Sequence, residues 1–421
     1  MHSNSATYTI ALHMLLLLAF STAAISVQAS YGGGVPAPSG VTLYSTCGDS
    51  SQGLLYAVGN DTTNGLIYRI TKLTSNGYEL FVNQSPQIHG KDYVRLRFYA
   101  CKVVDDYLFV VGETLKNDWD GSIIVYSISK GTSVAEKSYN IRGVSVRFID
   151  VEVSKVGNTY YIYALLITTG KKNNIRIAYT SFSGTSLGTT SNVAIGTGSG
   201  YEITLYGNYL GVLWKSGSNL YLSIYSVSSG SPTFLKQVAV IQNFNGAWAS
   251  VTSYSDGFLV AASGNIYRAY YSGAWGVETL VLSAFSGIPY AVYVAEKSGA
   301  KATYIFSQSS SSVYITAVDL VKKSTAYRDT VASASLSGYG DATVAWVDPN
   351  NNNVVSSTTP NARPYMVYTV TITSSAQSSY AIYYDLSRGG TTPYPVPEPW
   401  LTNIVVIIVS IISTTTILKK S

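Results

Sequence analysis

Short apolar runs, separated by turn residues, recur along the chain. The segment DGSIIVYSIS at 120–129 places Asp-Gly, a common turn pair, before a run of β-branched and aromatic residues. Six similar segments occur elsewhere in the chain. The first apolar residues of the seven successive segments are separated by 57, 52, 45, 46, 47 and 53 residues. A period of about 45–50 residues is typical of four-stranded β-propeller blades. These seven first apolar residues are Leu66, Ile123, Ile175, Leu220, Ile266, Val313 and Met366.

Further strand-like runs flank most of these segments. One lies just before, as at 54–59; another lies further upstream, as at 94–103; a fourth lies downstream, as at 234–241. The pattern predicts an all-β fold, a seven-bladed β-propeller over about residues 41–386. The seventh blade is the least regular, because its second strand has to be 353–359, after a run of Asn. Six blades with a small strand module, or tandem β-sandwiches, are the alternative architectures.

The N-terminus has the pattern of a secretory signal peptide. Residues 11–25 are apolar, and Val27 and Ala29 supply small residues at the −3 and −1 positions of a cleavage site. We therefore expect residues 1–29 to be a signal peptide. Residues 1–10 contain no Lys or Arg, so an uncleaved N-terminal anchor is the alternative.

The C-terminus has the pattern of a membrane anchor. Residues 400–418 carry no charge, their centre at 404–412 is almost all Ile and Val, and as a helix they are about 28 Å long, enough to cross a bilayer core. Before them, residues 387–399 contain alternating prolines and predict a stiff stalk, while Lys419 and Lys420 place the tail 419–421 in the cytoplasm. The expected location is the cell membrane, in a single pass with the ectodomain outside. A buried helix or strand of the globular domain is the alternative for this run.

These two ends and the Ser/Thr/Tyr-rich composition resemble exported surface proteins of archaea, which combine an ectodomain, a stalk and a C-terminal hydrophobic helix ending in basic residues. The resemblance implies an archaeal-type, membrane-anchored surface protein. Residues 397–399, Pro-Glu-Pro, are similar to sorting tails of the PEP type, but the basic cluster here is only two lysines. Retention of the tail as an anchor is therefore the preferred interpretation.

Charge argues against nucleic-acid binding. Charged residues make up 12% of the chain, the net charge is +5, and no basic run is longer than two residues. Hydrophobic residues make up 46%, which excludes a disordered chain, and the 36 Tyr suit a β-rich fold. We expect a glycan or a cell-envelope protein as partner, besides the membrane itself.

Few residues are available for nucleophile–base or metal chemistry. Two of the three His fall in the signal segment, and His89 stands alone in a loop. The cysteines Cys47 and Cys101 have no metal-type spacing; in an exported chain they form either a disulfide or two buried thiols. We expect no cofactor and no metal site.

Candidate site residues lie on the first strand of each predicted blade, because those strands line the central channel of a propeller. Asp150 and Glu152, at i and i+2, share one face of a strand. With Glu202 they are weak candidates for carboxylate catalysis of the glycosidase type. The alternative is a set of ion pairs around a wet channel. The predicted ligand-binding residues are Arg95, Arg97, Arg147, Trp248, Tyr290 and Asp341.

Two glycosylation sequons begin at Asn60 and Asn83, and Pro86 after the second weakens it. The sequence as a whole favours a cell-surface binding or adhesion module, more than an enzyme. An extracellular carbohydrate-active hydrolase or lyase and a structural cell-envelope component are the two alternatives.

Overall fold

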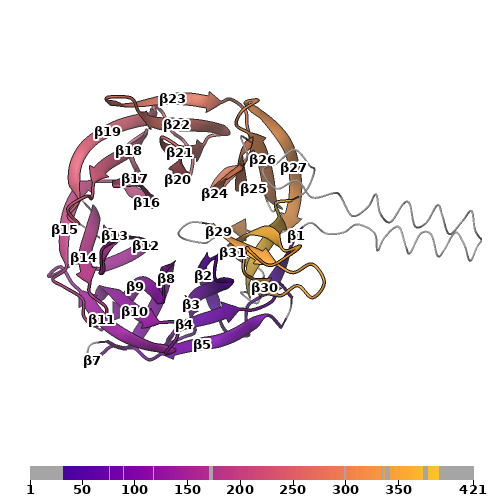
Figure 1. Cartoon of the computed structure of the whole chain (residues 1–421). Helices are drawn as coiled ribbons and strands as arrows, with labels where there is room; N and C mark the ends of the chain where they lie inside the picture. The colour runs from indigo at the N-terminus through magenta and orange to yellow at the C-terminus, as the bar shows by residue number, and fades with distance from the viewer. Residues whose placement is uncertain are drawn as a thin grey trace, which may run out of the picture.

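The fold is a seven-bladed β-propeller, as the sequence period predicts. The computed structural model describes residues 32–387 except 75, 89, 117, 170–173, 298–299, 311, 333–334, 337–341 and 373–377. Seven sheets surround a central channel (Figure 1), so the six-bladed and β-sandwich alternatives are wrong. Within the described residues no helix is long and apolar enough to span a membrane. The predicted signal peptide, the predicted stalk except Ser387, and the predicted C-terminal helix lie outside these residues.

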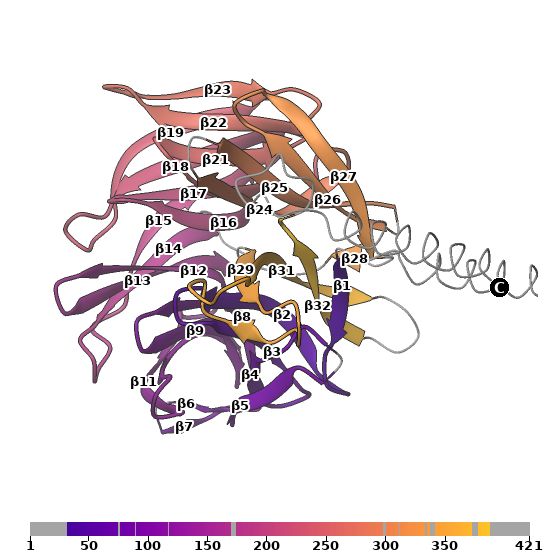
Figure 2. The same cartoon turned by 45° about the vertical axis from the view of Figure 1, so that its right-hand side comes forward.

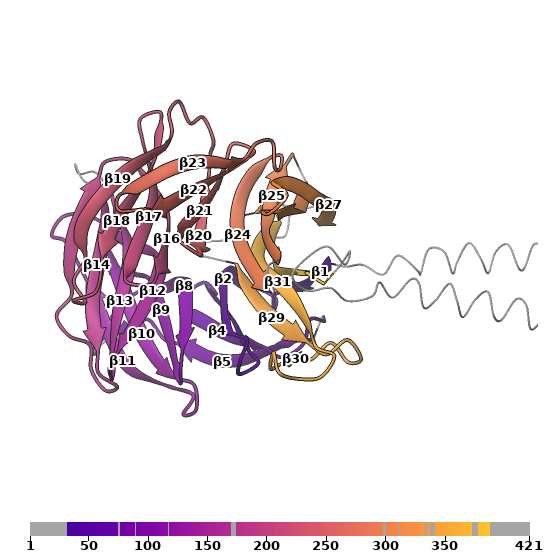
Figure 3. The same cartoon turned by 45° about the horizontal axis from the view of Figure 1, so that its top comes forward.

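One strand of each blade borders the channel (Figure 3). These innermost strands are β2 (Thr42–Asp49), β8 (Arg95–Val104), β12 (Val146–Val156), β16 (Ser199–Tyr206), β20 (Ser250–Tyr254), β24 (Ile288–Lys297) and β29 (Thr343–Val347). The second strands are β3 (Leu54–Asn60), β9 (Tyr107–Leu115), β13 (Thr159–Thr168), β17 (Tyr209–Ser216), β21 (Gly257–Ala262), β25 (Ala300–Ser309) and β31 (Arg363–Ile372).

The outer half of each blade consists of two further strands. The third strands are β4 (Gly65–Ile70), β10 (Trp119–Ser127), β14 (Ile175–Phe182), β18 (Asn219–Ser226), β22 (Asn265–Tyr271), β26 (Ser312–Asp319) and β32 (Ser378–Asp385). The outermost strands are β5 (Tyr78–Gln84), β11 (Thr132–Tyr139), β15 (Ser191–Gly196), β19 (Thr233–Ile241), β23 (Trp275–Val281), β27 (Ser324–Ala332) and β1 (Gly32–Pro36). Short strands add to these: β6 (Gln87–Ile88), β7 (Lys91–Asp92), β28 (Ser335–Leu336) and β30 (Val354–Val355).

Strand direction gives the propeller two distinct faces. Neighbouring strands of a blade are antiparallel. With four strands, the outermost strand ends at the face where the innermost strand of the next blade begins. All innermost strands therefore begin at one face, called here the front face, and end at the opposite one, the back face. The opening of the channel at the front face is called the front mouth.

The seventh blade is closed by the start of the chain. Strand β1 pairs with β32 (Figure 2), with Gly32 opposite Tyr384 and Pro36 opposite Tyr380. Val35 is fully buried in the core between the seventh and first blades. Closure thus joins residues separated by nearly the whole domain, and the predicted propeller range of 41–386 leaves this strand out.

The second strand predicted for the seventh blade, 353–359, is wrong. Only Val354 and Val355 of this segment form a strand, β30, which pairs with the end of β29. The second strand is β31, which the sequence pattern assigns as the third strand of its blade. The third strand is then β32, and β1 is the fourth. The Asn-rich segment before 353 is a turn, where Asp348 accepts a hydrogen bond from the N–H of Asn350 at 2.9 Å.

The Asp-Gly pair of the segment 120–129 lies inside a strand rather than in a turn. Strand β10 begins at Trp119, and a Cβ atom at Gly121 would lie 2.7 Å from the ring of Phe148 on the next blade. Gly65 has the same relation to Phe98, at 2.5 Å. Glycine recurs at these two positions because an aromatic ring of the following blade packs directly on the strand.

Candidate ligand-binding site

The central channel holds a cavity of about 320 Å³ that is lined by the innermost strands of all seven blades. Its wall is polar and charged, unlike the apolar cores between the blades. The channel residues include Lys102, Asp150, Glu152, Thr204, Thr252, Tyr293 and Thr343.

Two of the predicted carboxylates bridge neighbouring blades. Asp150 accepts hydrogen bonds from the N–H groups of Val151 and Ile203, each at 2.8 Å. Glu202 accepts one from the N–H of Val251 at 2.7 Å and one from the hydroxyl of Ser250 at 2.8 Å. Each side chain thus fastens the innermost strand of its own blade to that of the next.

The third carboxylate, Glu152, forms an ion pair. Lys102 Nζ lies 2.9 Å from each of its two carboxylate oxygens, and both side chains line the cavity. Glu152 is buried, while Lys102 keeps 36% of its side chain exposed. Sequence reasoning missed Lys102, because a single lysine within an apolar strand gives no motif.

Asp150 carries a strongly shifted carboxyl group. Burial raises its pKa to about 7, and the nearby charge of Glu152 adds to this effect. The two backbone hydrogen bonds and the charge of Lys102 act in the opposite direction. Asp150 therefore changes its protonation near neutral pH, although it is enclosed in the channel wall.

This shift predicts a pH dependence of stability. The pKa of Asp150 is about 7 in the folded protein, against an ordinary value of 3.8. The folded state therefore holds the proton more tightly than the unfolded chain does. The contribution of this proton to the free energy of unfolding is complete at low pH and is lost as the pH rises through about 7. The expected slope reaches about 1.4 kcal/mol per pH unit at its steepest.

The measurement compares urea unfolding of the wild type and Asp150→Asn between about pH 4 and pH 8. Groups that do not interact with Asp150 titrate equally in both proteins, so the difference between the curves reports the Asp150 carboxyl and its interactions. We expect the difference to change steeply over this range. Parallel curves would show that the carboxyl does not titrate there.

The front mouth is bordered by aromatic residues that sit at β-bulges. In five blades the innermost strand has one extra residue, in its first half, relative to the second strand with which it pairs. A bulge re-aims a side chain and increases the local twist. The bulged residues are Tyr44, Tyr99, Ile149, Tyr201 and Tyr290.

This border is called here the aromatic rim and consists of Tyr44, Tyr99, Tyr201, Trp248 and Tyr290; two separate groups of ring contacts lie within it. The centroids of Tyr44 and Tyr99 are 4.9 Å apart. Trp248, just before β20, lies 5.0 Å from Tyr201 and is stacked on Tyr290 at 6.0 Å. Tyr99 and Tyr201 are buried, whereas Tyr44, Trp248 and Tyr290 are half-buried and present surface at the mouth.

A buried glutamate organises two arginines at the same mouth. Glu113 on β9 is 1% exposed and accepts three hydrogen bonds. Arg97 Nη1 donates at 3.2 Å, Arg147 Nε at 2.8 Å and the Tyr99 hydroxyl at 2.6 Å. Arg97 also lies over the ring of Trp119 at 4.6 Å, and Arg147 lies over that of Tyr99 at 5.1 Å.

The structure thus separates the predicted site residues into groups. Arg97 and Arg147 meet at Glu113, and Trp248 and Tyr290 form a second, stacked pair; both pairs lie at the front ends of their strands. Arg95 is exposed at the start of β8. Asp341 and His89 lie outside the described residues. Of the two sequon residues, Asn83 is exposed on β5, and Asn60 is half-buried with its side-chain amide donating to the carbonyl of Asp61.

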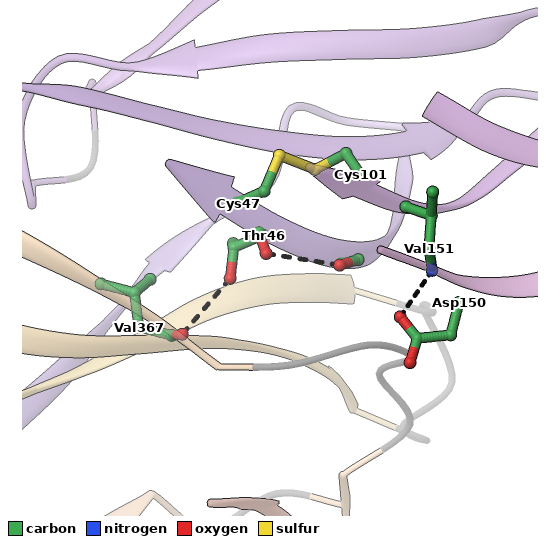
Figure 4. The surroundings of a disulfide bond; sticks show 7 residues. Thr46, Cys47, Cys101, Asp150, Val151 and Val367 are labelled. Carbon is green, nitrogen blue, oxygen red and sulfur yellow. Dashed lines mark hydrogen bonds between the residues drawn. A yellow bond between two sulfur atoms is a disulfide. The ribbon is translucent and has the colours of Figure 1, made fainter. Parts of the chain in front are cut away.

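Cys47 and Cys101 form a disulfide in the channel wall (Figure 4). Their Cα atoms are 5.7 Å apart and 54 residues separate them. The bond connects the innermost strands of the first and second blades, β2 and β8. Figure 4 also shows Thr46 donating to the carbonyl of Val367, which ties the first blade to the seventh.

Two further hollows lie on the outer wall. One of about 590 Å³ follows β11 beside the loop at 185–187, and one of about 410 Å³ lies between Tyr209, Tyr271 and Trp275. Neither contains a buried charged group, whereas the channel combines buried carboxylates with the arginines and aromatic rings of its mouth. The channel and its front mouth are therefore the stronger candidate.

Comparisons with known proteins support the fold. No family model matches the chain, and no curated protein does. Among solved structures, the Dos1 propeller is 12% identical with a TM-score of 0.50, over 82% of this chain and 78% of that chain. Hydrazine synthase of Kuenenia stuttgartiensis is 13% identical, with a TM-score of 0.48 over 76% and 91% of the two chains. At such identities the likeness shows the propeller fold alone.

Proposed function

We propose that this chain is a cell-surface binding module that takes its ligand at the front mouth. The aromatic rim is the observation that carries the proposal. Half-buried rings of Tyr44, Trp248 and Tyr290 lie at the same end of the channel as the charged groups of Arg97 and Arg147. Aromatic faces and guanidinium groups are the surfaces that recur in binding sites for sugars and for protein partners.

Chain direction supports an outward orientation of this mouth. Strand β32 ends at Asp385 on the back face, and Gly32 lies beside it. The predicted stalk and anchor follow β32 and therefore leave from the back face. If residues 400–418 cross the membrane, the front mouth points away from it and toward ligands outside the cell.

Among ligands, a polysaccharide fits the mouth better than a folded protein. Protein interfaces need a broad surface of roughly 800 Å² on each partner. The end of a sugar chain needs only a few rings and polar groups, such as those at the mouth. A purely structural envelope role would require no such arrangement. We therefore place glycan binding first.

Hydrolysis of a polysaccharide is the second candidate. The shifted carboxyl of Asp150, close to Glu152 in the same cavity, is the feature that favours it. The contacts of these groups argue against it: both oxygens of Asp150 accept backbone hydrogen bonds, and Glu152 is held by Lys102. Both carboxylates thus have protein partners that compete with a role as acid or base.

One experiment separates the two candidates. The full chain in detergent is incubated with a panel of neutral and acidic polysaccharides, and both retention and newly formed reducing ends are measured. Retention without reducing ends is the expected result. Reducing ends that disappear in Glu152→Gln would establish the hydrolase instead. Absence of both signals would favour a protein partner or a structural envelope role.

A further inference from the structure

Two guanidinium groups share one carboxylate at the front mouth. Arg97, Arg147 and Glu113 are called here the arginine cluster; it carries a net charge of +1. Glu113 is nearly inaccessible, whereas the two arginine side chains remain 29% and 41% exposed. The negative charge is thus enclosed, and the positive charges face the mouth.

Two further acidic residues, Asp118 and Asp120, flank Trp119, over which Arg97 lies. Among the described residues, Arg97 forms its ion pair with Glu113 and not with either aspartate. Exposed Arg95, at the start of the same strand, adds a further positive charge.

Both guanidinium groups are fixed in orientation before any ligand arrives. Arg147 is held through Nε by Glu113 and lies over the Tyr99 ring; Arg97 is held through Nη1 and lies over Trp119. A planar guanidinium fork suits the paired oxygens of a carboxylate or sulfate group. Fixed groups lose little conformational entropy on binding, which favours affinity.

We propose that the front mouth is selective for acidic polysaccharides, whose carboxylate or sulfate groups bind Arg97 and Arg147 while their sugar rings contact the aromatic rim. This inference rests on the proposed binding function and names its ligand class. If the arginine cluster only fastened the second blade to the third, the affinity for a polysaccharide would not depend on the charge of that polysaccharide.

Strand β12 supplies a matched control. Arg147 near its start and Lys155 near its end each have a side chain that is 41% exposed, and each forms an ion pair, Arg147 with Glu113 at 2.8 Å and Lys155 with Asp105 at 2.7 Å. Arg147→Gln and Lys155→Gln therefore remove the same charge from opposite faces of the propeller. Any effect of net charge alone is equal in both variants.

The experiment measures affinity of the full chain in detergent for polygalacturonate, dextran sulfate and neutral dextran. The wild type is expected to bind one or both acidic chains more tightly than dextran, and to lose this preference as salt is added. Arg147→Gln is expected to weaken acidic binding roughly 10- to 100-fold, with Lys155→Gln unchanged. Polygalacturonate and dextran sulfate together distinguish carboxylate from sulfate recognition.

Two results would overturn the inference. Equal losses in Arg147→Gln and Lys155→Gln would show non-specific charge attraction. Tight binding of neutral dextran that is insensitive to Arg147→Gln would refute acidic selectivity, yet leave the proposed binding function intact. Failure of the wild type to bind any of the three chains would contradict both. Comparison of the three chains on the wild type needs no variant, so poor folding of Arg147→Gln cannot obscure the outcome.

Discussion

Replacement of Cys47 and Cys101 by alanine is expected to lower the free energy of unfolding by about 4 kcal/mol, because the disulfide closes a loop of 54 residues. Loop closure removes conformational entropy from the unfolded chain, and a loop of this length lies near the upper end of the usual range. The bond also joins β2 to β8, and so holds the first blade, which contacts the closing seventh blade, to the second.

The measurement is guanidinium unfolding of the double variant against the wild type, each with and without reductant. Reductant should bring the wild type close to the variant and leave the variant unchanged. If the double variant unfolds at the wild-type midpoint, the disulfide does not contribute to closure of the ring.

Substitution of Val35 by Asp is expected to detach β1 and cost about 4 kcal/mol or more, since it places an unpaired carboxylate in the core between the seventh and first blades. Val35 is fully buried, and its backbone pairs with Ala381 on β32. Loss of β1 would expose the outer edge of β32, which invites aggregation.

Hydrogen exchange along β32 tests this directly, together with the unfolding midpoint. Amides of 378–385 should exchange much faster in Val35→Asp than in the wild type. Ser39→Asp, in the exposed connection between β1 and β2, serves as the control and should behave as the wild type. Unchanged protection of β32 in Val35→Asp would mean that β1 does not close the propeller.

The repeat of the fold could be predicted because it rests on buried strands. In six blades the repeating segments are third strands, buried on both faces, and their residues Ile123 and Leu220 are almost inaccessible. Strand β1 could not be predicted in the same way. Its sequence, Gly-Gly-Gly-Val-Pro, has little β-propensity, and it is a strand because β32 offers it a paired edge.

The site was predicted in part, for a similar reason. The innermost strands were located well enough to place Arg97, Arg147 and Tyr290 on them and Trp248 just before one of them. Glu113 was missed because it lies on a second strand and acts across the blade boundary. A signal for the aromatic rim was present but unused. Aligning the innermost strands places tyrosine at the same position in four of them, namely Tyr44, Tyr99, Tyr201 and Tyr290.

The most direct test of the binding function is the retention of a polysaccharide by variants of the aromatic rim. Trp248→Ala and Tyr290→Ala remove the stacked pair at the front mouth, whereas Tyr271→Ala removes a tyrosine that is 49% exposed on the outer wall. The account predicts that the polysaccharide retained by the wild type is lost by the first two variants, by roughly tenfold or more in affinity, and kept by the third. Undiminished retention in both rim variants, or its loss in Tyr271→Ala, would contradict binding at the front mouth.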